Sequence, residues 1–176
     1  MRFLPHIGLY NQTSAKLKLK SGVYYSTQPT EIPMGAMAVE DGRVYEFRRL
    51  SGATWTAGSL VYNTGTAGDN YVCLSGTGII PVGVNLVTLA TSGAWTWIQK
   101  YGKCNVQATT TFGVDGTTKL TQAMYSLGGS GAYNITAAIS AAAIGSAGVA
   151  QFPVLFGYAL SDCTEATAGP AFIHLL

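Results

Sequence analysis

Charged side chains are scarce in this chain. Asp, Glu, Lys and Arg make up 10% of its 176 residues, whereas they make up about a quarter of an ordinary soluble domain. A free monomer with so few charges tends to associate. Such a protein stays in solution if partners cover its faces, or if hydroxyl and amide groups take the place of charges. We favour covered faces and predict a homo-oligomer.

Histidine is nearly absent, and the acidic residues form no pair that suggests catalysis. His6 and His174 lie near the two ends of the chain, and neither belongs to a motif for a nucleophile or a metal ion. The eight acidic residues mostly adjoin turn signals, where carboxylates accept hydrogen bonds from backbone amides. The short glycine-rich segments lack the helix that a phosphate site requires. The sequence therefore predicts no enzymatic activity, no cofactor and no metal site.

Cysteines are few, odd in number and far apart. Cys73, Cys104 and Cys163 have neither the even count of a disulfide framework nor the paired spacing of a zinc site. We expect buried free thiols, which behave as small apolar side chains.

Long hydrophobic runs are missing as well. The opening segment "MRFLPHIGLYNQTS" has no apolar core of the kind found in export signals. The segment from Thr136 to Ala150, "TAAISAAAIGSAGVA", is too short and too rich in small residues to span a bilayer. We therefore expect a chain made in the cytoplasm, with no membrane partner.

Positive charge is concentrated in one short block near the start. Residues 1 to 30 contain four basic residues and no acidic one, and three of the four, Lys16, Lys18 and Lys20, form the segment "KLKLK". A nucleic-acid binder needs a basic patch on its folded body, so we predict no nucleic-acid partner. The block is either an edge strand whose lysines face water or part of an arm that reaches an acidic partner.

What the chain has in abundance is strand-forming sequence. Short runs of Val, Ile, Tyr, Phe, Trp and Thr are separated by Gly, Asn and Asp, which is typical of many short strands. We predict an all-β protein, a β-sandwich or small β-barrel over residues 35 to 176. Residues 1 to 34, which contain Pro5, Pro29 and Pro33, form an extended N-terminal arm in this prediction. The clearest element is "AMAVEDGRVYEF", because Asp41 and Gly42 suit a two-residue turn, and it predicts a hairpin near residues 36 to 48.

A weak internal repeat divides the β-domain. The segment "GSLVYNTG", residues 58 to 65, resembles "QAMYSLGG", residues 122 to 129. Each is followed by a Gly-led segment, so that Gly157 matches Gly83, and Phe172 with Ile173 matches Trp97 with Ile98. This alignment predicts two similar β units near residues 57 to 106 and 122 to 176, with chance alignment of a glycine-rich chain as the alternative.

Aromatic residues gather in the segment "GAWTWIQKYG". In an extended strand, Trp95, Trp97, Gln99 and Tyr101 share one face, because side chains alternate. A core row is the first interpretation, since burial of large rings stabilises a fold. An intersubunit anchor is the second, and a ligand site is the third.

Two segments resemble a known family. "GAMAVEDGRVYEFRRLSGATWTAGSLVYNTG", residues 35 to 65, looks like the opening of small capsid-decoration proteins of tailed bacteriophages. "PVGVNLVTLATSGAWTWIQKYGKCNV", residues 81 to 106, is similar to their recurring piece with a "GV" strand and a "W-x-Q-x-x-G" strand. The resemblance implies a β-rich cement protein on the outer surface of the virion. It also implies an oligomer, by preference a trimer, that binds the major capsid protein and has no enzymatic activity.

This hypothesis gives a set of candidate contacts to the capsid or to neighbouring subunits. Arg43, Arg48 and Arg49 suit acidic capsid faces, with ordinary solvated charges as the alternative. The full set is Lys16, Lys18, Lys20, Arg43, Arg48, Arg49, Trp95, Trp97 and Tyr101. The rival hypothesis is a carbohydrate-binding or fibre-type adhesion module, in which Trp55, Trp95 or Tyr101 forms an exposed platform for sugar rings.

Overall fold

A computed structural model gives the fold of this chain. It describes residues 24–30, 32–51, 55–63, 72–74, 81–89, 93–108, 123–126, 133–134, 154–164 and 167–175. The described residues contain strands and no helix, which confirms the predicted all-β class. The strands are β1 (Met37–Glu40), β2 (Arg43–Leu50), β3 (Leu60–Asn63), β4 (Val72–Leu74), β5 (Pro81–Asn85), β6 (Ala94–Gln107), β7 (Ala123–Ser126), β8 (Tyr133–Asn134), β9 (Val154–Ala159) and β10 (Ala168–His174).

The predicted hairpin is confirmed. Strands β1 and β2 are antiparallel, and Glu40 pairs with Arg43 across a two-residue turn. Asp41 and Gly42 both have positive φ, at 50° and 72°. This is the turn whose twist matches that of the two strands it joins.

Five strands pair in a closed ring. The order β2-β4-β3-β5-β6 returns to β2, because β2 pairs with both β4 and β6. One apolar cluster fills the inside of the ring, with members on β2, β3 and β6 and on the segments that follow β2 and β5. Its buried residues are Leu50, Trp55, Val61, Val87, Leu89, Ala94 and Ile98.

A second group of strands repeats part of this arrangement. The strand order β8-β7-β9-β10 follows the same chain order as β4-β3-β5-β6. Val61 pairs with Gly83 and Met124 pairs with Gly157, and the register shifts immediately after each of these pairs. The equivalence of Gly83 and Gly157 therefore agrees with the pairing.

The pairing of β6 and β10 shows that the predicted repeat alignment is wrong in the last strand of each unit. Phe172 pairs with Tyr158, the residue after Gly157, whereas Gln99 pairs with Val84, the residue after Gly83. Phe172 therefore corresponds to Gln99 in position. Its expected equivalence to Trp97 is wrong by two residues, because glycines spaced alike do not fix the register of a third strand.

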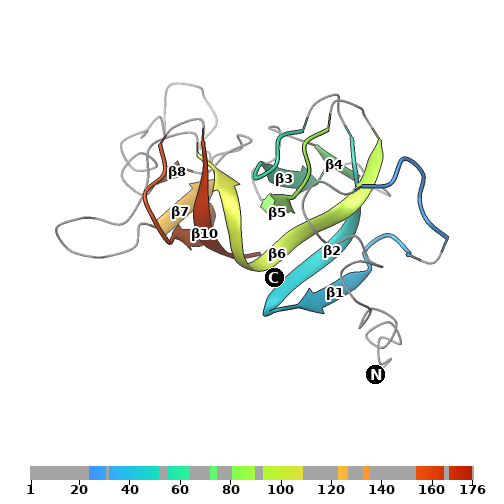
Figure 1. Cartoon of the computed structure of the whole chain (residues 1–176), viewed down its shortest axis with the longest axis horizontal. Coiled ribbons are helices and arrows are strands. Elements are labelled where there is room, and N and C mark those ends of the chain that lie inside the picture. Colours follow the sequence, from blue (N-terminus) through green and yellow to red (C-terminus); the bar gives the residue numbers. More distant parts are fainter. Residues whose placement is uncertain are drawn as a thin grey trace.

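Strand β6 joins the two groups (Figure 1). Its first half pairs with β2 and β5, and its second half, from Tyr101, pairs with β10. A shared core lies between the groups, since one buried cluster contains Leu60 and Tyr62 of β3 together with Phe156 of β9 and Ile173 of β10. The described strands therefore form one packed body.

The end of the predicted arm packs on this body. Tyr25 exchanges two backbone hydrogen bonds with Trp95, at 2.8 and 2.9 Å. Ile32 is only 4% exposed and belongs to the same cluster as Phe47 and Trp97. The expected start of the core near residue 35 is therefore corrected to an earlier position. The "KLKLK" segment lies outside the described residues.

Candidate functional site

The tryptophans are structural rather than exposed. Trp55 and Trp97 are each 1% exposed. Trp97 packs on Phe47 with ring centroids 5.3 Å apart, and the half-buried Trp95 stacks on the same ring at 6.2 Å. The core interpretation therefore holds for Trp97, and burial removes Trp55 as a platform for sugar rings.

Tyr101 does not share the face of the two tryptophans, which corrects the predicted aromatic row. Tyr45 of β2 pairs with Gln99, whereas its neighbour Val44 pairs with Tyr101. Lys100 is thus an extra residue, and a bulge of this kind shifts the alternation of side chains. Tyr101 therefore points to the face of Val44, where its ring meets Phe172 at 5.1 Å and His174 at 5.6 Å.

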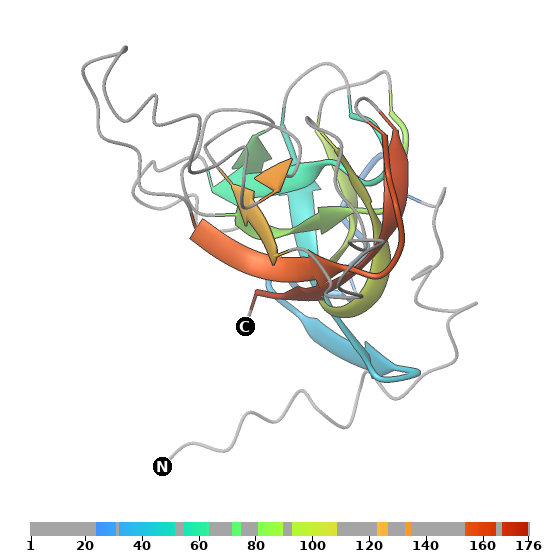
Figure 2. The ribbon, with the colours of Figure 1, turned by 90° about the vertical axis from the view of Figure 1, so that its left-hand side faces the viewer.

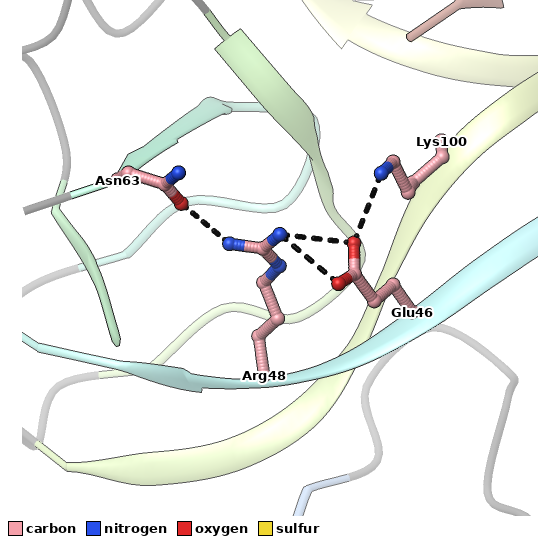
Figure 3. A network of polar contacts seen from close by, with 4 residues as sticks. All are labelled: Glu46, Arg48, Asn63 and Lys100. Carbon is pink, nitrogen blue, oxygen red and sulfur yellow. Dashed lines mark hydrogen bonds and ion pairs between the residues drawn. The ribbon is translucent and has the colours of Figure 1, made fainter. Parts of the chain in front are cut away.

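Arg48 is buried in an ion network, so it is not a surface contact. Its side chain points into the strand ring, and the residue is 6% exposed. Its guanidinium donates to both carboxylate oxygens of Glu46, at 3.0 and 3.1 Å, and to the side-chain oxygen of Asn63. Lys100 reaches the same carboxylate at 3.1 Å (Figure 3). The prediction that Arg48 contacts an acidic partner is therefore wrong, because its charge is paired inside the protein.

The other two predicted arginines lie at the surface. Arg49 is exposed, and its guanidinium carbon lies 5.8 Å from the ring centre of Trp95. Arg43 is exposed at the hairpin and lies close to Gly102. Both remain available to a partner. Lys16, Lys18 and Lys20 lie outside the described residues.

A row of exposed or half-exposed side chains crosses five neighbouring strands. Val39 pairs with Val44, Val44 pairs with Tyr101, and Tyr101 pairs with His174. Paired residues of neighbouring strands share a face. Phe172 follows on the same face of β10, and it stacks on Tyr158 of β9 at 5.3 Å. Figure 2 shows the strands β1, β2, β6, β10 and β9 that carry this row.

We call this row the cross-strand strip. Its seven members are Val39, Val44, Leu155, Tyr101, Tyr158, Phe172 and His174. Val39 is 66% exposed, Leu155 58% and Tyr158 40%. One exposed apolar side chain is ordinary, whereas a continuous row of them is informative. No member is acidic, and the exposed Lys103, which pairs with Phe172, stands at its border.

The strip contains an open groove at its β9–β10 end. The groove encloses about 310 Å³ and is lined by Tyr101, Leu155, Phe156, Gly157, Tyr158, Phe172 and His174. A bulge in β9 helps to build it, because Met124 pairs with Gly157 while Tyr125 pairs with Leu155. Phe156 is the extra residue and is buried, so Leu155 and Tyr158 can lie on one side.

A larger, more polar cavity is lined in part by the hairpin tip. It measures about 570 Å³, and its lining includes Glu40, Asp41, Arg43, Lys103 and Cys104. Two acids and two bases leave it without a net charge. Burial raises the pKa of the Cys104 thiol to about 12, although the Arg43 cation opposes this shift. A thiol with such a pKa is protonated and unreactive near neutral pH.

The described residues show no metal centre. No group of three or more His, Cys, Asp or Glu side chains that could hold a metal ion occurs among them. Cys104 and Cys163 are free thiols, and the side chain of Cys73 lies outside the description. Within the same part of the chain, no helix has the length and apolar character to cross a membrane.

Comparison with known proteins adds no assignment. No protein-family model matches the chain, and no curated protein matches it at a significant level. The likeness of residues 35 to 65 and 81 to 106 to capsid-decoration proteins therefore stays a prediction.

Proposed function

We propose that this protein is a structural virion protein that binds the outside of a tailed-phage capsid and stabilises the shell. The observation that carries the proposal is the cross-strand strip. An exposed, nearly uncharged row over five strands is the kind of surface that marks a protein-binding site. The strands that hold it are anchored by buried clusters on their other face, so the strip is a rigid surface.

The proposed mechanism is mechanical. A protein that binds the assembled shell, and not its separate subunits, shifts the equilibrium toward the shell. The strip supplies the apolar contact area. Arg43 and Arg49 lie on the other face of β2, because side chains alternate along the strand and Arg49 lies over the ring of Trp95. They add charges for a neighbouring acidic capsid subunit. Lys16, Lys18 and Lys20 provide a further basic segment. Many weak contacts of this kind add up when several copies bind together.

The experiment is co-sedimentation with undecorated shells, assembled from the major capsid protein of the genome that encodes this chain. The wild-type protein should pellet with the shells and raise their melting temperature. A Leu155→Lys/Tyr158→Lys variant should bind at least tenfold more weakly, because two ammonium groups in the apolar groove lose hydration on contact.

The matched control is Thr56→Lys, which adds a charge at an exposed residue outside the strip. It should bind like the wild type. Absence of binding by the wild-type protein, or equal binding by the strip variant, would reject the proposal. A genome without a capsid gene would reject it as well.

A carbohydrate-binding module is the second candidate, and one observation favours it. Tyr158 and Phe172 stack with an angle of 11° between their planes, and Tyr101 and His174 stand beside them. Aromatic faces with polar tips suit a sugar ring. Isothermal titration with polysaccharide from the host cell surface separates the two functions. Heat released by the wild type and lost in Tyr158→Ala, without any binding to shells, would favour the sugar site.

A further inference from the structure

Strand β1 ends the sheet of described strands, and among these strands one of its two edges is unpaired. β1 pairs with β2, and no described strand pairs with its other edge. Phe47 donates its backbone N–H to the carbonyl of Ala36. In an antiparallel pair, residues alternate between those bonded to the partner and those directed away from it. Residues 36, 38 and 40 therefore face β2, and the backbone groups of Met37 and Val39 point to the open edge.

The side chains at this edge are exposed and apolar. Met37 is 39% exposed, whereas Ala38 between Met37 and Val39 is buried against the cluster that contains Phe47. Natural edge strands usually carry a lysine, a proline or a bulge that prevents further pairing. Within Met37–Glu40, β1 has the sequence MAVE and a regular ladder to β2, so this stretch has none of these features. The irregular pairing lies before it, where Gly35 and Ala36 both bond to Phe47.

We propose that the open edge of β1 binds the β1 edge of a second copy of this chain. The strands would run antiparallel about a two-fold axis at Ala38. Met37 then lies opposite Val39 of the partner subunit, and both have their N–H and C=O groups directed across the interface. Four backbone hydrogen bonds and two Met–Val contacts result from this register.

Charge is compatible with a second copy as the occupant. Glu40 is the only charged residue of β1. In the two-fold register it lies opposite Ala36 of the partner subunit, so the two Glu40 carboxylates stand at opposite ends of the ladder. A two-fold dimer uses the same surface on both subunits, and such dimers are the commonest symmetric oligomers.

The pairing also extends the cross-strand strip. Val39 is the strip's last member, and Met37 lies two residues away on the same face of β1. Contact between Met37 and Val39 of the partner subunit would join two strips into one surface. The dimer itself does not rest on the proposed capsid function. It differs from the trimer that the family resemblance implies, because a two-fold strand pairing closes at two copies.

Sedimentation velocity of the full chain tests the proposal. Protein concentrations from about 1 to 100 μM cover dissociation constants on the order of those of weak protein dimers. The wild type should show the mass of a dimer. Met37→Lys/Val39→Lys should sediment as a monomer. Two lysines from each subunit would bring four ammonium groups together along the short β1–β1 ladder, and their charges would repel. Both positions are exposed, and circular dichroism will show whether the variant keeps the fold.

Leu155→Lys/Tyr158→Lys is the matched control. It places the same two charges at the far end of the strip, so it should remain a dimer. If it becomes a monomer, strip faces rather than β1 edges associate, and the proposal is wrong. A trimer, or a dimer that survives the β1 substitutions, would contradict it too.

Hydrogen exchange identifies what covers the edge. The Met37 and Val39 amides should exchange slowly in the wild type and become fast in the β1 variant. A wild-type monomer with slow exchange at both amides would mean that another part of the same chain occupies the edge. A monomer with fast exchange would mean that nothing does. Either result would overturn the proposal.

Discussion

Val44 is the cross-strand partner of Tyr101, while Tyr45, the next residue, is the partner of Gln99. The extra residue in β6 is Lys100, and it separates two surfaces. Before it, Trp97 packs on Phe47, and after it Tyr101 packs on Phe172 and His174. One inserted residue therefore assigns half of an aromatic row to the core and the other half to the exposed strip.

Gly102 follows this bulge and tests how tightly the hairpin tip fits against β6. Its φ is 96°, and a Cβ at this position would lie 2.9 Å from the carbonyl oxygen of Gly42. We expect Gly102→Ala to lower the free energy of unfolding by about 2–4 kcal/mol, through backbone strain and the close contact together. Urea unfolding measures this difference.

Gly42→Ala is the matched comparison. Gly42 has a φ of 72°, but no atom lies within 4 Å of an added Cβ. Gly42→Ala should lower the free energy of unfolding by about 1 kcal/mol, through backbone strain alone. Equal losses for the two variants would mean that the contact with the hairpin tip has no energetic role.

The ion network inside the strand ring should be essential to stability. Glu46→Ala removes the carboxylate that Arg48 and Lys100 share. Two cations would then remain in a largely buried site, so we expect a loss of about 3–5 kcal/mol in unfolding free energy. A Glu46→Leu/Arg48→Met double variant should recover much of this loss, because it removes a buried charge of each sign. Thermal unfolding measures both variants. A lower melting temperature for the double variant than for Glu46→Ala would contradict this explanation.

The two tryptophans of β6 should differ in their contribution to stability. Trp97 is fully buried, so Trp97→Ala should cost about 3–5 kcal/mol. Trp95 is half-buried and stacks on Phe47 from one side, so Trp95→Ala should cost less. Chemical denaturation measures both. An equal or larger loss for Trp95 would indicate that its contacts with Tyr25 and Arg49 outweigh burial.

The N-terminal segment should be divisible near Tyr24. A chain that starts at Tyr24 keeps the backbone hydrogen bonds of Tyr25 with Trp95 and the buried Ile32, so its melting temperature should stay close to that of the full chain. A chain that starts at residue 34 loses both contacts and should melt at least about 5 °C lower. Equal melting temperatures would restore the original boundary at residue 35.

Alkaline pH should destabilise the fold partly through Cys104. Burial raises the pKa of its thiol from 9.0 to about 12, so above pH 9 the unfolded chain releases a proton that the folded chain keeps. The unfolding free energy should therefore fall as pH rises from 9 toward 12, by up to about 1.4 kcal/mol per pH unit from this group. Desolvation also raises the pKa of Tyr45, which adds to the fall. In Cys104→Ala the fall should be shallower, and an unchanged slope would exclude the thiol.

The sequence predicted local structure well and long-range placement poorly. Asp41 and Gly42 predict the hairpin, because its turn depends only on residues that are adjacent in the sequence. The burial of Arg48 had no such signal, because Asn63, which accepts a hydrogen bond from Arg48, and Lys100, which shares the Glu46 carboxylate, come close only after the ring closes. Leu155, Tyr158 and Phe172 were missed as surface residues for the same reason. Their exposure depends on the bulge at Phe156, and the register of a distant partner strand decides where such a bulge falls.

The most direct test of the account is electron cryo-microscopy of undecorated shells mixed with the purified full chain. We expect additional density on the outside of the shell, with the strands β1, β2, β6, β10 and β9 oriented so that Tyr158 and Leu155 face the capsid protein. Shells that remain bare at saturating protein concentration, or bound protein whose strip faces the solvent, would contradict it.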